Sequence, residues 1–381
     1  MFHEFITFVR ELYDTSDYIP LHSPAFQGNE KKYLLEAIDS TYVSSVGESI
    51  GEFESKLAEY TGSAYAIATV NGTSALHLSL LLAGVERNTE VLTQSLTFVA
   101  TCNAVSYLGA DPVFIDIDRS TLNLSPTKLK VFLEEKCEVR SDGSCWNKNT
   151  NKKISACLPM HTYGFTAELD LLKIICEEFN IPLVEDAAES LGSFYKGKHT
   201  GSIGLLSALS FNGNKVITTG GGGMILTNDE ILAKKAKHIS TQAKVSHPWE
   251  FNHDDLGYNY RMPNLNAALG LAQLENLEAY LKSKKIIAKK YQAWGEKNGV
   301  TFKTNNKDAD SNFWLNCFFA KNVEERNKFL KETNKSKVMT RPAWNPIHTL
   351  PYYSSCLRDD LKDTIWVFDR LVNVPSSPIL K

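Results

Sequence analysis

The sequence has few of the features that mark membrane, metal-binding or nucleic-acid-binding proteins. It contains no apolar run near the roughly 18 residues that a membrane-spanning helix needs. Its seven cysteines include no CxxC pair, which argues against a zinc site and favours scattered free thiols in a reducing cytoplasm. The net charge is only −3, so the bulk electrostatics favour neither nucleic acid nor an anionic membrane as a partner.

The composition that remains is typical of a soluble globular protein, with 43% hydrophobic and 22% charged residues. At 381 residues the chain exceeds the usual size of a single hydrophobic core. We therefore expect a large domain over residues 1–245 and a smaller C-terminal domain over residues 246–381. An apolar stripe from Phe2 to Leu12, interrupted by acidic residues, predicts a short amphipathic N-terminal helix rather than a signal peptide.

Short apolar, β-branched runs alternate with helical patterns over the first two thirds of the chain. The predicted strands are AYAIATV (64–70), EVLTQ (90–94), DPVFIDID (111–118), ISACLPM (154–160), IPLVED (181–186), LSALSF (206–211) and GGMILTN (222–228). Such alternation predicts a mostly parallel sheet covered by helices on both faces. The polar stretch at about 137–153 predicts a surface insertion. Because ligands bind beyond the carboxyl ends of strands in such sheets, the chemistry should lie there.

At two of the strand ends, the polar residues could have either a functional or a purely structural role. In NGTSAL (71–76), free amides at the start of a helix could bind a phosphate, although many strand-to-helix turns contain Gly-Thr. In LVEDAAES (183–190), the acidic residues could simply cap the next helix. Alternatively, one of these carboxylates holds a cationic ring nitrogen, as a pyridinium cofactor needs.

A lysine follows a third strand in SALSFNGNKVITTGGGGMI (207–225). Taken alone, Lys215 reads as a surface residue beside a flexible loop. An amine that forms a Schiff base, however, needs a partly desolvated setting, and glycines let a planar cofactor lie against backbone. A nucleotide-binding P-loop is excluded because FNGNKV lacks the first glycine and the hydroxyl residue after the lysine. Phosphate amides, an aspartate, a serine and a lysine in this order outline a pyridoxal phosphate site.

The chain resembles the DegT/DnrJ/EryC/StrS family of sugar aminotransferases over nearly its whole length. The matching stretches, in family order, are SSVGESIGEFE (44–54), NGTSALHLSL (71–80), LTFVAT (96–101), MHTYG (160–164), VEDAAES (184–190), SFNGNK (210–215) and GYNYRMPNLNAALGLAQL (257–274). The resemblance implies the pyridoxal phosphate (PLP)-dependent transferase fold of type I, an α/β architecture. In that fold a mostly parallel seven-stranded sheet is sandwiched by helices, beside a smaller α+β C-terminal domain.

The same resemblance assigns roles to individual residues. Lys215 falls at the Schiff-base lysine that later moves a proton, and Asp186 at the aspartate that pairs with the pyridine nitrogen. Phe98 matches the aromatic ring that stacks on the cofactor. The remaining expected cofactor contacts are the phosphate cradle of Thr73, Ser74 and Ser210, and Asn259, which reaches the phosphate of the neighbouring subunit. The implied active unit is a homodimer with shared sites.

Four further residues lie in family motifs with open roles. For His161 and Tyr163, a structural role at the sheet end is as compatible with the motif as direct substrate contact. Arg261 could neutralise a phosphate or pair within the fold. His348 lies where relatives approach the sugar nucleotide, although a lone histidine is more often structural.

Two positions depart from the family pattern. Glu189 stands where most members have Gln or His, a side chain that donates a hydrogen bond near the cofactor's phenolic oxygen. An ionised glutamate cannot donate, which leaves its role in doubt. Gly221 stands where the family commonly has Glu. Both departures, with the insertion and the ending VNVPSS, resemble the branch that serves legionaminic acid and bacillosamine synthesis on UDP-linked 4-keto-6-deoxy-N-acetylhexosamine.

The resemblance therefore predicts a cytoplasmic aminotransferase that cycles between PLP and pyridoxamine phosphate. It would move an amino group from L-glutamate, leaving 2-oxoglutarate, to a UDP-linked 4-keto-6-deoxy sugar, with Lys215 as the acid/base. Alternatives are the same chemistry on a GDP- or dTDP-linked keto-sugar, and a catalytically silent binding or regulatory protein with the same fold. Related dehydratases replace the lysine with histidine, so Lys215 argues against that reaction.

Overall fold

The structure is a computed structural model that describes residues 2–380. Its helices are α1 (Phe2–Tyr13), α2 (Glu30–Asp39), α3 (Glu48–Thr61), α4 (Gly72–Leu82), α5 (Val99–Tyr107), α6 (Pro126–Lys136), α7 (Leu169–Glu178), α8 (Glu230–Ser240), α9 (Asn264–Glu275), α10 (Leu277–Asn298), α11 (Val323–Lys335) and α12 (Lys362–Phe368). Within this range, no helix combines the length and apolar character that crossing a bilayer requires.

The strands that form the central sheet are β1 (Tyr65–Thr69), β2 (Glu90–Gln94), β3 (Asp111–Ile115), β6 (Lys152–Leu158), β7 (Val184–Asp186), β10 (Leu206–Ser210) and β11 (Gly223–Thr227). Backbone bridges between Cys157 and Leu183 and between Met160 and Asp186 join a sheet that contains β6 to one that ends in β7. The resulting order is β3-β2-β6-β7-β10-β11-β1, in which only β11 runs antiparallel to its neighbours. The prediction of a mostly parallel seven-stranded sheet is confirmed.

Shorter strands extend this sheet or form two small separate sheets. They are β4 (Cys137–Val139), β5 (Cys145–Asn147), β8 (Phe194–Tyr195), β9 (Lys198–His199), β12 (Ala309–Asp310), β13 (Asn316–Phe319), β14 (Arg341–Pro342) and β15 (Leu371–Val374). The predicted insertion at 137–153 is a hairpin of β4 and β5 that extends β6. β13, β15 and β14 form a separate antiparallel sheet.

Helices cover both faces of the central sheet, as the side-chain alternation along β1 illustrates. Ile67 points to a core packed by α4, α5 and α8, whereas Ala66 and Ala68 point to a core with α3 and α9. This period of two is what a strand buried on both faces requires. The strand ends that carry the candidate chemistry are thereby held by two packed layers.

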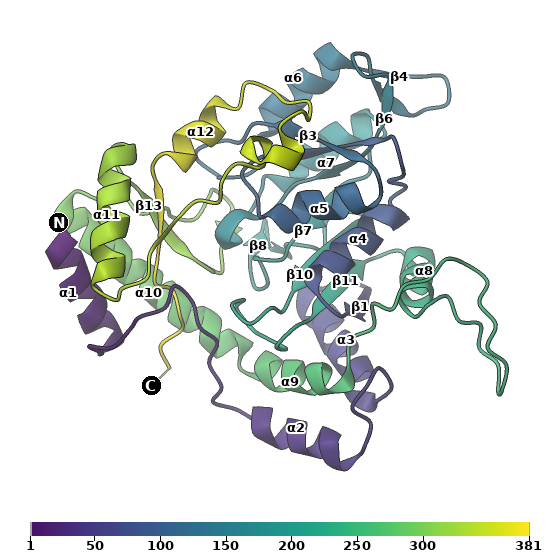
Figure 1. Ribbon diagram of the computed structural model, residues 1–381, viewed down its shortest axis with the longest axis horizontal. Helices are drawn as coiled ribbons and strands as arrows, with labels where there is room; N and C mark the ends of the chain where they lie inside the picture. The colour runs from purple at the N-terminus through teal and green to yellow at the C-terminus, as the bar shows by residue number, and fades with distance from the viewer. Residues whose placement is uncertain (1, 381) are drawn as a thin grey trace.

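The N-terminal helix α1 packs on elements from the other end of the chain. Phe5 and Val9 share a buried cluster with Tyr291 of α10 and Phe329 of α11. Figure 1 shows these three helices together at the left of the molecule, beside the central sheet. The predicted division at residue 245 stays a prediction, and its outermost residues, 1 and 381, lie outside the described residues.

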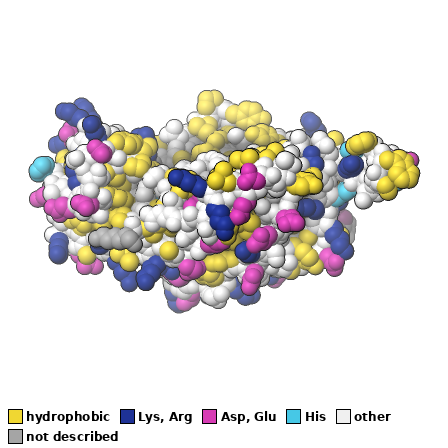
Figure 2. Space-filling view, turned by 90° about the horizontal axis from the view of Figure 1, so that it is seen from below, with side chains coloured by type: hydrophobic (Ala, Val, Ile, Leu, Met, Phe, Trp, Pro, Cys, Tyr) yellow, Lys and Arg dark blue, Asp and Glu magenta, His cyan; other side chains and the backbone are white. Residues whose placement is uncertain are grey.

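A long excursion, here called the arm (residues 244–258), separates α8 from α9. It projects from the body at the right of Figure 1, and Figure 2 shows it as a lobe with hydrophobic side chains on its surface. Trp249, Phe251 and Leu256 on the arm are 75–80% exposed. These side chains give the arm an apolar surface that no other described residue covers.

Candidate active site

The carboxyl ends of β7 and β10 and the start of α4 meet at one cavity of about 250 Å³. Register explains the meeting, because Ala208 on β10 lies opposite Asp186 on β7, and Ser210 lies opposite Gly223 on β11. The cavity is lined by Asn71, Gly72, Thr73, Leu76, Phe98, Ala100, Met160, Asp186, Ala188, Glu189, Ser210, Asn212, Asn214, Lys215, Gly221, Gly222, Trp314 and Trp344. Six predicted cofactor residues therefore come together: Thr73, Phe98, Asp186, Glu189, Ser210 and Lys215.

The start of α4 forms one wall of this cavity. Asn71 caps the helix, and its side-chain oxygen accepts a hydrogen bond of 2.8 Å from the Ser74 amide. A Cβ atom at Gly72 would lie 2.8 Å from the Ser210 Cβ, so only glycine allows this approach of α4 to β10. The electropositive helix end, with Thr73 and Ser210 beside it, suits a phosphate group. The Ser74 amide is already used by the cap.

Asp186 is a buried carboxylate at the end of β7. The Thr101 hydroxyl donates to its Oδ2 at 2.7 Å, and the Ala188 amide donates to its Oδ1 at 3.2 Å. Burial raises the pKa of Asp186, although these two hydrogen bonds and the Lys215 charge oppose the shift. Among the residues that the structure describes, no cationic side chain forms an ion pair with it. A cationic ring nitrogen would therefore compensate its burial.

Lys215 extends from the loop after β10 and meets Glu189. Its Nζ atom lies 3.3 Å from Glu189 Oε1 and 4.2 Å from the centre of the Trp314 ring. The other carboxylate oxygen of Glu189 accepts a hydrogen bond of 2.9 Å from the Tyr163 amide. Burial raises the pKa of Glu189 to about 7, with the Lys215 charge opposing it. Near neutral pH the carboxyl is thus partly protonated, and in that form it can donate a hydrogen bond.

The raised pKa of Glu189 predicts a pH-dependent contribution to the stability of the cofactor-free protein. A carboxyl with a raised pKa in the folded state stabilises most below its unfolded value of 4.5, and the contribution disappears as the pH rises through about 7. Between about pH 5 and pH 8, the free energy of unfolding measured in urea should therefore fall by about 2–3 kcal/mol more in wild type than in Glu189→Gln. Equal pH dependence in the two proteins would contradict this.

His161 does not reach the cavity, because both of its ring nitrogens are engaged inside the protein. Its Nδ1 accepts from the Ala167 amide at 3.2 Å, and its Nε2 lies 3.1 Å from Glu185 Oε2. Burial raises the pKa of Glu185, but His161 and the Gly204 and Gly201 amides outweigh it, so the pKa lies below its ordinary value. These contacts favour the structural alternative for His161.

His348 and Tyr163 also lie outside the cavity lining. The Ser95 hydroxyl accepts from the His348 backbone amide at 3.1 Å, and it lies 2.7 Å from His348 Nδ1. These two contacts tie His348 to Ser95, which directly follows β2. Tyr163 is buried with its ring 4.5 Å from that of Trp344, and it lines a second cavity on the far side of this tryptophan.

Asn259 and Arg261 lie before α9, away from the cavity lining. The Asn259 side chain is exposed and accepts a long hydrogen bond of 3.4 Å from the Arg261 guanidinium. Arg261 forms a backbone bridge with Thr69 at the end of β1. The predicted contact of Asn259 with a neighbouring subunit requires a second chain and stays a prediction.

Sequence reasoning missed the two tryptophans that line the cavity. Trp314 precedes β13, and its indole N–H donates to the Asn214 carbonyl oxygen at 2.7 Å. Trp344 lies in RPAWNP (341–346), shortly before His348, and only His348 was predicted to be a site residue in this part of the sequence. Trp344 packs edge-on against Phe98 at 6.2 Å. Clusters of aromatic residues in the C-terminal part were the available signal, but no periodicity connects them to strand ends 100 residues earlier.

Two glycines of the 220–223 run differ in what the backbone demands. A Cβ atom at Gly223 would overlap the Asn71 carbonyl oxygen, which the approach of β11 to the start of α4 brings close. A Cβ atom at Gly221 would meet only the Val70 oxygen at 3.9 Å. Packing therefore fixes glycine at 223, whereas the missing acidic side chain at 221 leaves space at the rim of the cavity.

This difference predicts opposite outcomes for two alanine substitutions. Gly223→Ala should lower the free energy of unfolding by about 1–3 kcal/mol, because the added methyl group displaces backbone. Gly221→Ala should stay within about 0.5 kcal/mol of wild type. Denaturant unfolding of the two variants checks the result, and equal destabilisation would show that the loop does not pack as described.

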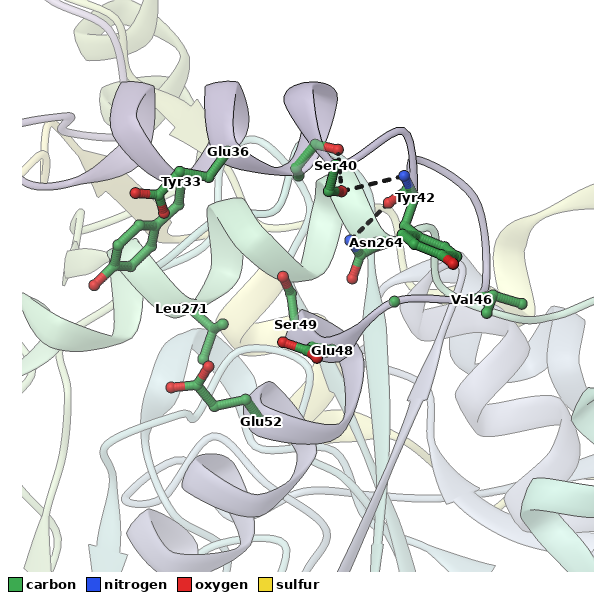
Figure 3. Close-up of a pocket in the computed structure, with 12 residues that line it drawn as sticks. Tyr33, Glu36, Ser40, Tyr42, Val46, Glu48, Ser49, Glu52, Asn264 and Leu271 are labelled. Atoms are coloured by element: carbon green, nitrogen blue, oxygen red, sulfur yellow. Dashed lines mark hydrogen bonds between the residues drawn. The ribbon is translucent and has the colours of Figure 1, made fainter.

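A larger groove lies elsewhere, between α2, α3 and α9 (Figure 3). It measures about 760 Å³, and Glu36, Glu48 and Glu52 line it. Asn264 at its edge donates from Nδ2 to the Tyr42 carbonyl oxygen at 2.7 Å. Its described lining contains no lysine, histidine or cysteine.

Comparison with known proteins identifies relatives over nearly the full chain. A sequence profile described as the DegT/DnrJ/EryC1/StrS aminotransferase family matches residues 24–381. GDP-perosamine synthase of Escherichia coli O157:H7 is 37% identical over 365 residues, which are 95% of this chain and 94% of that protein. The putative pyridoxal phosphate-dependent aminotransferase EpsN of Bacillus subtilis (strain 168) is 37% identical over 347 residues, 91% of this chain and 86% of that protein.

Solved structures share the fold. PseC of Helicobacter pylori, an aminotransferase involved in the biosynthesis of pseudoaminic acid, superposes with a TM-score of 0.85 at 23% identity over 94% of both chains. The expected transferase fold is thus confirmed. The relatives do not confirm the UDP-linked branch, since the Escherichia coli protein is named for a GDP-linked sugar.

Proposed function

The chain belongs to the DegT/DnrJ/EryC1/StrS aminotransferase family, and from this premise we propose that it aminates a nucleotide-linked 4-keto-6-deoxy sugar with L-glutamate as donor. The protein is a PLP-dependent sugar aminotransferase, and its cofactor cycles through pyridoxamine phosphate. The observation that carries the aminotransferase chemistry in this proposal is the meeting of Lys215, Asp186 and the start of α4 at one cavity.

The residues around the cavity fit the cofactor by their chemistry. A helix end suits its phosphate, a buried carboxylate suits its protonated ring nitrogen, and an amine at 13% side-chain exposure suits its aldehyde. When bound, PLP supplies an electron-accepting ring that stabilises negative charge on the carbon that loses a proton. Lys215 would hold the cofactor and move that proton, and Asp186 would keep the ring nitrogen protonated. Thr73 and Ser210 would bind the phosphate, and Phe98 would cover the ring.

Glu189 is positioned to work with Lys215 in these proton transfers. Its carboxyl lies 3.3 Å from the amine, and its pKa of about 7 lets it hold or release a proton near neutral pH. A catalytic acid or base is most effective when its pKa lies near the working pH. The protonated Glu189 side chain can therefore donate a hydrogen bond in place of the Gln or His side chain that most relatives have at this position.

Two sugar nucleotides compete as the acceptor. The departures at Glu189 and Gly221 support UDP-2-acetamido-2,6-dideoxy-hexos-4-ulose, whose amination serves surface-glycan synthesis of the legionaminic acid or bacillosamine type. The name of the Escherichia coli relative supports a GDP-linked keto-sugar of the perosamine type. The two acceptors demand the same chemistry at Lys215 and differ in the nucleotide and in the substituent at the second ring carbon.

A half-reaction decides between them. Protein loaded with pyridoxamine phosphate is mixed with each keto-sugar nucleotide, and the visible absorbance of the lysine-bound cofactor is followed. Return of the band with the UDP-sugar supports the first acceptor, and return with the GDP-sugar alone supports the second. A protein that stays colourless with PLP and with every keto-sugar nucleotide would contradict the proposed function.

We further propose that the active unit is a homodimer with shared sites. The exposed aromatic arm and the exposed side chain of Asn259 beside it support a partner at this face. Burial of Trp249, Phe251 and Leu256 against a second copy would remove this apolar surface from water. Light scattering that gives the mass of a single chain, with full activity, would contradict the proposal.

A further inference from the structure

A second cavity adjoins the cofactor cavity and shares three of its walls. It measures about 530 Å³, and Asn214, Trp314 and Trp344 line both spaces. Its other lining residues are Leu21, His22, Tyr163, Leu315, Met339, Arg341, Pro342, Ala343, Asn345 and Asn373. The two tryptophans thus stand between the Lys215 amine and a separate space. A substrate that reacts at Lys215 could extend past them.

The second cavity contains a buried histidine without a hydrogen-bond partner. Both ring nitrogens of His22 are buried, and neither has a partner among residues 2–380. Burial lowers the pKa of His22 well below its ordinary value, and the charges of Lys284 and Lys215 act in the same direction. The ring is therefore neutral and offers one N–H donor. An unpaired buried donor costs free energy unless a ligand or water completes it.

The charges around this cavity have one sign. Arg341 lines it, and no aspartate or glutamate is among its described lining residues. Behind the wall, the Lys284 amine donates to the carbonyl oxygens of Trp314 at 3.1 Å and Ser376 at 2.6 Å. Within the described chain, the Arg341 side chain forms no ion pair. A cavity lined by a guanidinium without an internal partner and by a neutral histidine favours a small anion.

The position of the cavity selects the anion. Lys215 Nζ lies 4.2 Å from the centre of the Trp314 ring, and that ring also lines the second cavity. A dicarboxylic amino acid carries its second carboxylate a few bonds from its reacting amine, so it could extend from Lys215 past this ring into the second cavity. One arginine and one neutral donor suit a single carboxylate better than a diphosphate, which needs more positive charge.

On the basis of the proposed function, we infer that the second cavity binds the side-chain carboxylate of the dicarboxylic amino donor. Arg341 pairs with this carboxylate, and the His22 N–H donates to it. The cavity thereby selects glutamate over its neutral isostere glutamine. Under this inference, binding of the keto-sugar nucleotide does not require Arg341.

The test compares L-glutamate with L-glutamine as donors. In PLP-loaded Arg341→Gln, the apparent affinity for L-glutamate should fall on the order of ten- to a hundredfold, because a charge-assisted pair is lost. Use of L-glutamine and the half-reaction with the keto-sugar nucleotide should not change. Arg87→Gln, an exposed arginine on another surface, serves as the matched control and should behave as wild type.

A binding measurement without turnover completes the test. Glutarate, which has no amine to react, should bind wild type in calorimetry at least roughly tenfold more tightly than Arg341→Gln. Equal loss of both donors, or loss confined to the keto-sugar half-reaction, would overturn the inference. If wild type reacts with donors and Arg341→Gln matches Arg87→Gln, only the inference fails. If wild type reacts with no amino acid, the proposed function fails as well.

Discussion

Lys215→Ala is expected to abolish the absorbance band of lysine-bound PLP and to reduce turnover by on the order of 10³-fold or more. The proposed function makes this amine the covalent anchor and the proton carrier, and alanine can be neither. Absorbance spectra and steady-state rates of the purified variant measure both effects. Added PLP should still bind in part, because the start of α4 and Asp186 remain in place.

Lys303 provides the control for this substitution. Burial lowers the pKa of Lys303 to about 8, so by acidity alone it would be a reactive amine. Its Nζ donates to the Thr304 carbonyl oxygen at 2.5 Å and to Asn306 Oδ1 at 2.6 Å, and it does not line the cofactor cavity. Lys303→Ala should keep the absorbance band. A band that survives Lys215→Ala but not Lys303→Ala would place the reactive centre elsewhere.

Asp186→Asn is expected to lower the rate of the half-reaction with L-glutamate by on the order of 10²–10³-fold. A neutral amide cannot hold a proton on the ring nitrogen, so the ring accepts electrons less well. The loss should appear in the rate constant at saturating donor rather than in donor affinity, which rapid-mixing absorbance measurements separate.

Thr101→Val is a milder variant that perturbs the same carboxylate. It removes the hydroxyl that donates to Asp186 Oδ2 at 2.7 Å but leaves the charge in place. We expect a loss of only roughly tenfold, because one orienting hydrogen bond is worth about 1–1.5 kcal/mol. An Asp186→Asn variant within about twofold of wild type would contradict the role assigned to this carboxylate.

The elements of the central sheet could be predicted because each is encoded locally. EVLTQ, DPVFID and GGMILT carry apolar runs bounded by turn residues, and Ser125 with Pro126 marks the start of α6. The Ser125 hydroxyl accepts from the Lys128 amide at 3.4 Å, as an N-cap should. The antiparallel direction of β11 was not predicted; in the structure the connection from β10 contains no helix, which an antiparallel pair allows.

Features of the site that depend on contacts between distant segments could not be predicted. The pKa of Glu189 depends on burial by elements far along the chain, and the engagement of both His161 nitrogens depends on Glu185 and Ala167. Trp314 and Trp344 reach the cavity only because the C-terminal part packs over the strand ends. The resemblance to a family assigns the reacting residues, but the residues that surround them can be identified only from the three-dimensional structure.

The central claim is that Lys215 carries the cofactor. Borohydride reduction of the PLP-loaded protein makes the lysine–cofactor bond permanent, and peptide mass spectrometry then locates the added mass. The account predicts that the pyridoxyl group is found on Lys215 and is absent from Lys303 and Lys284. A label on another lysine, or no label in a protein that is catalytically active, would contradict it.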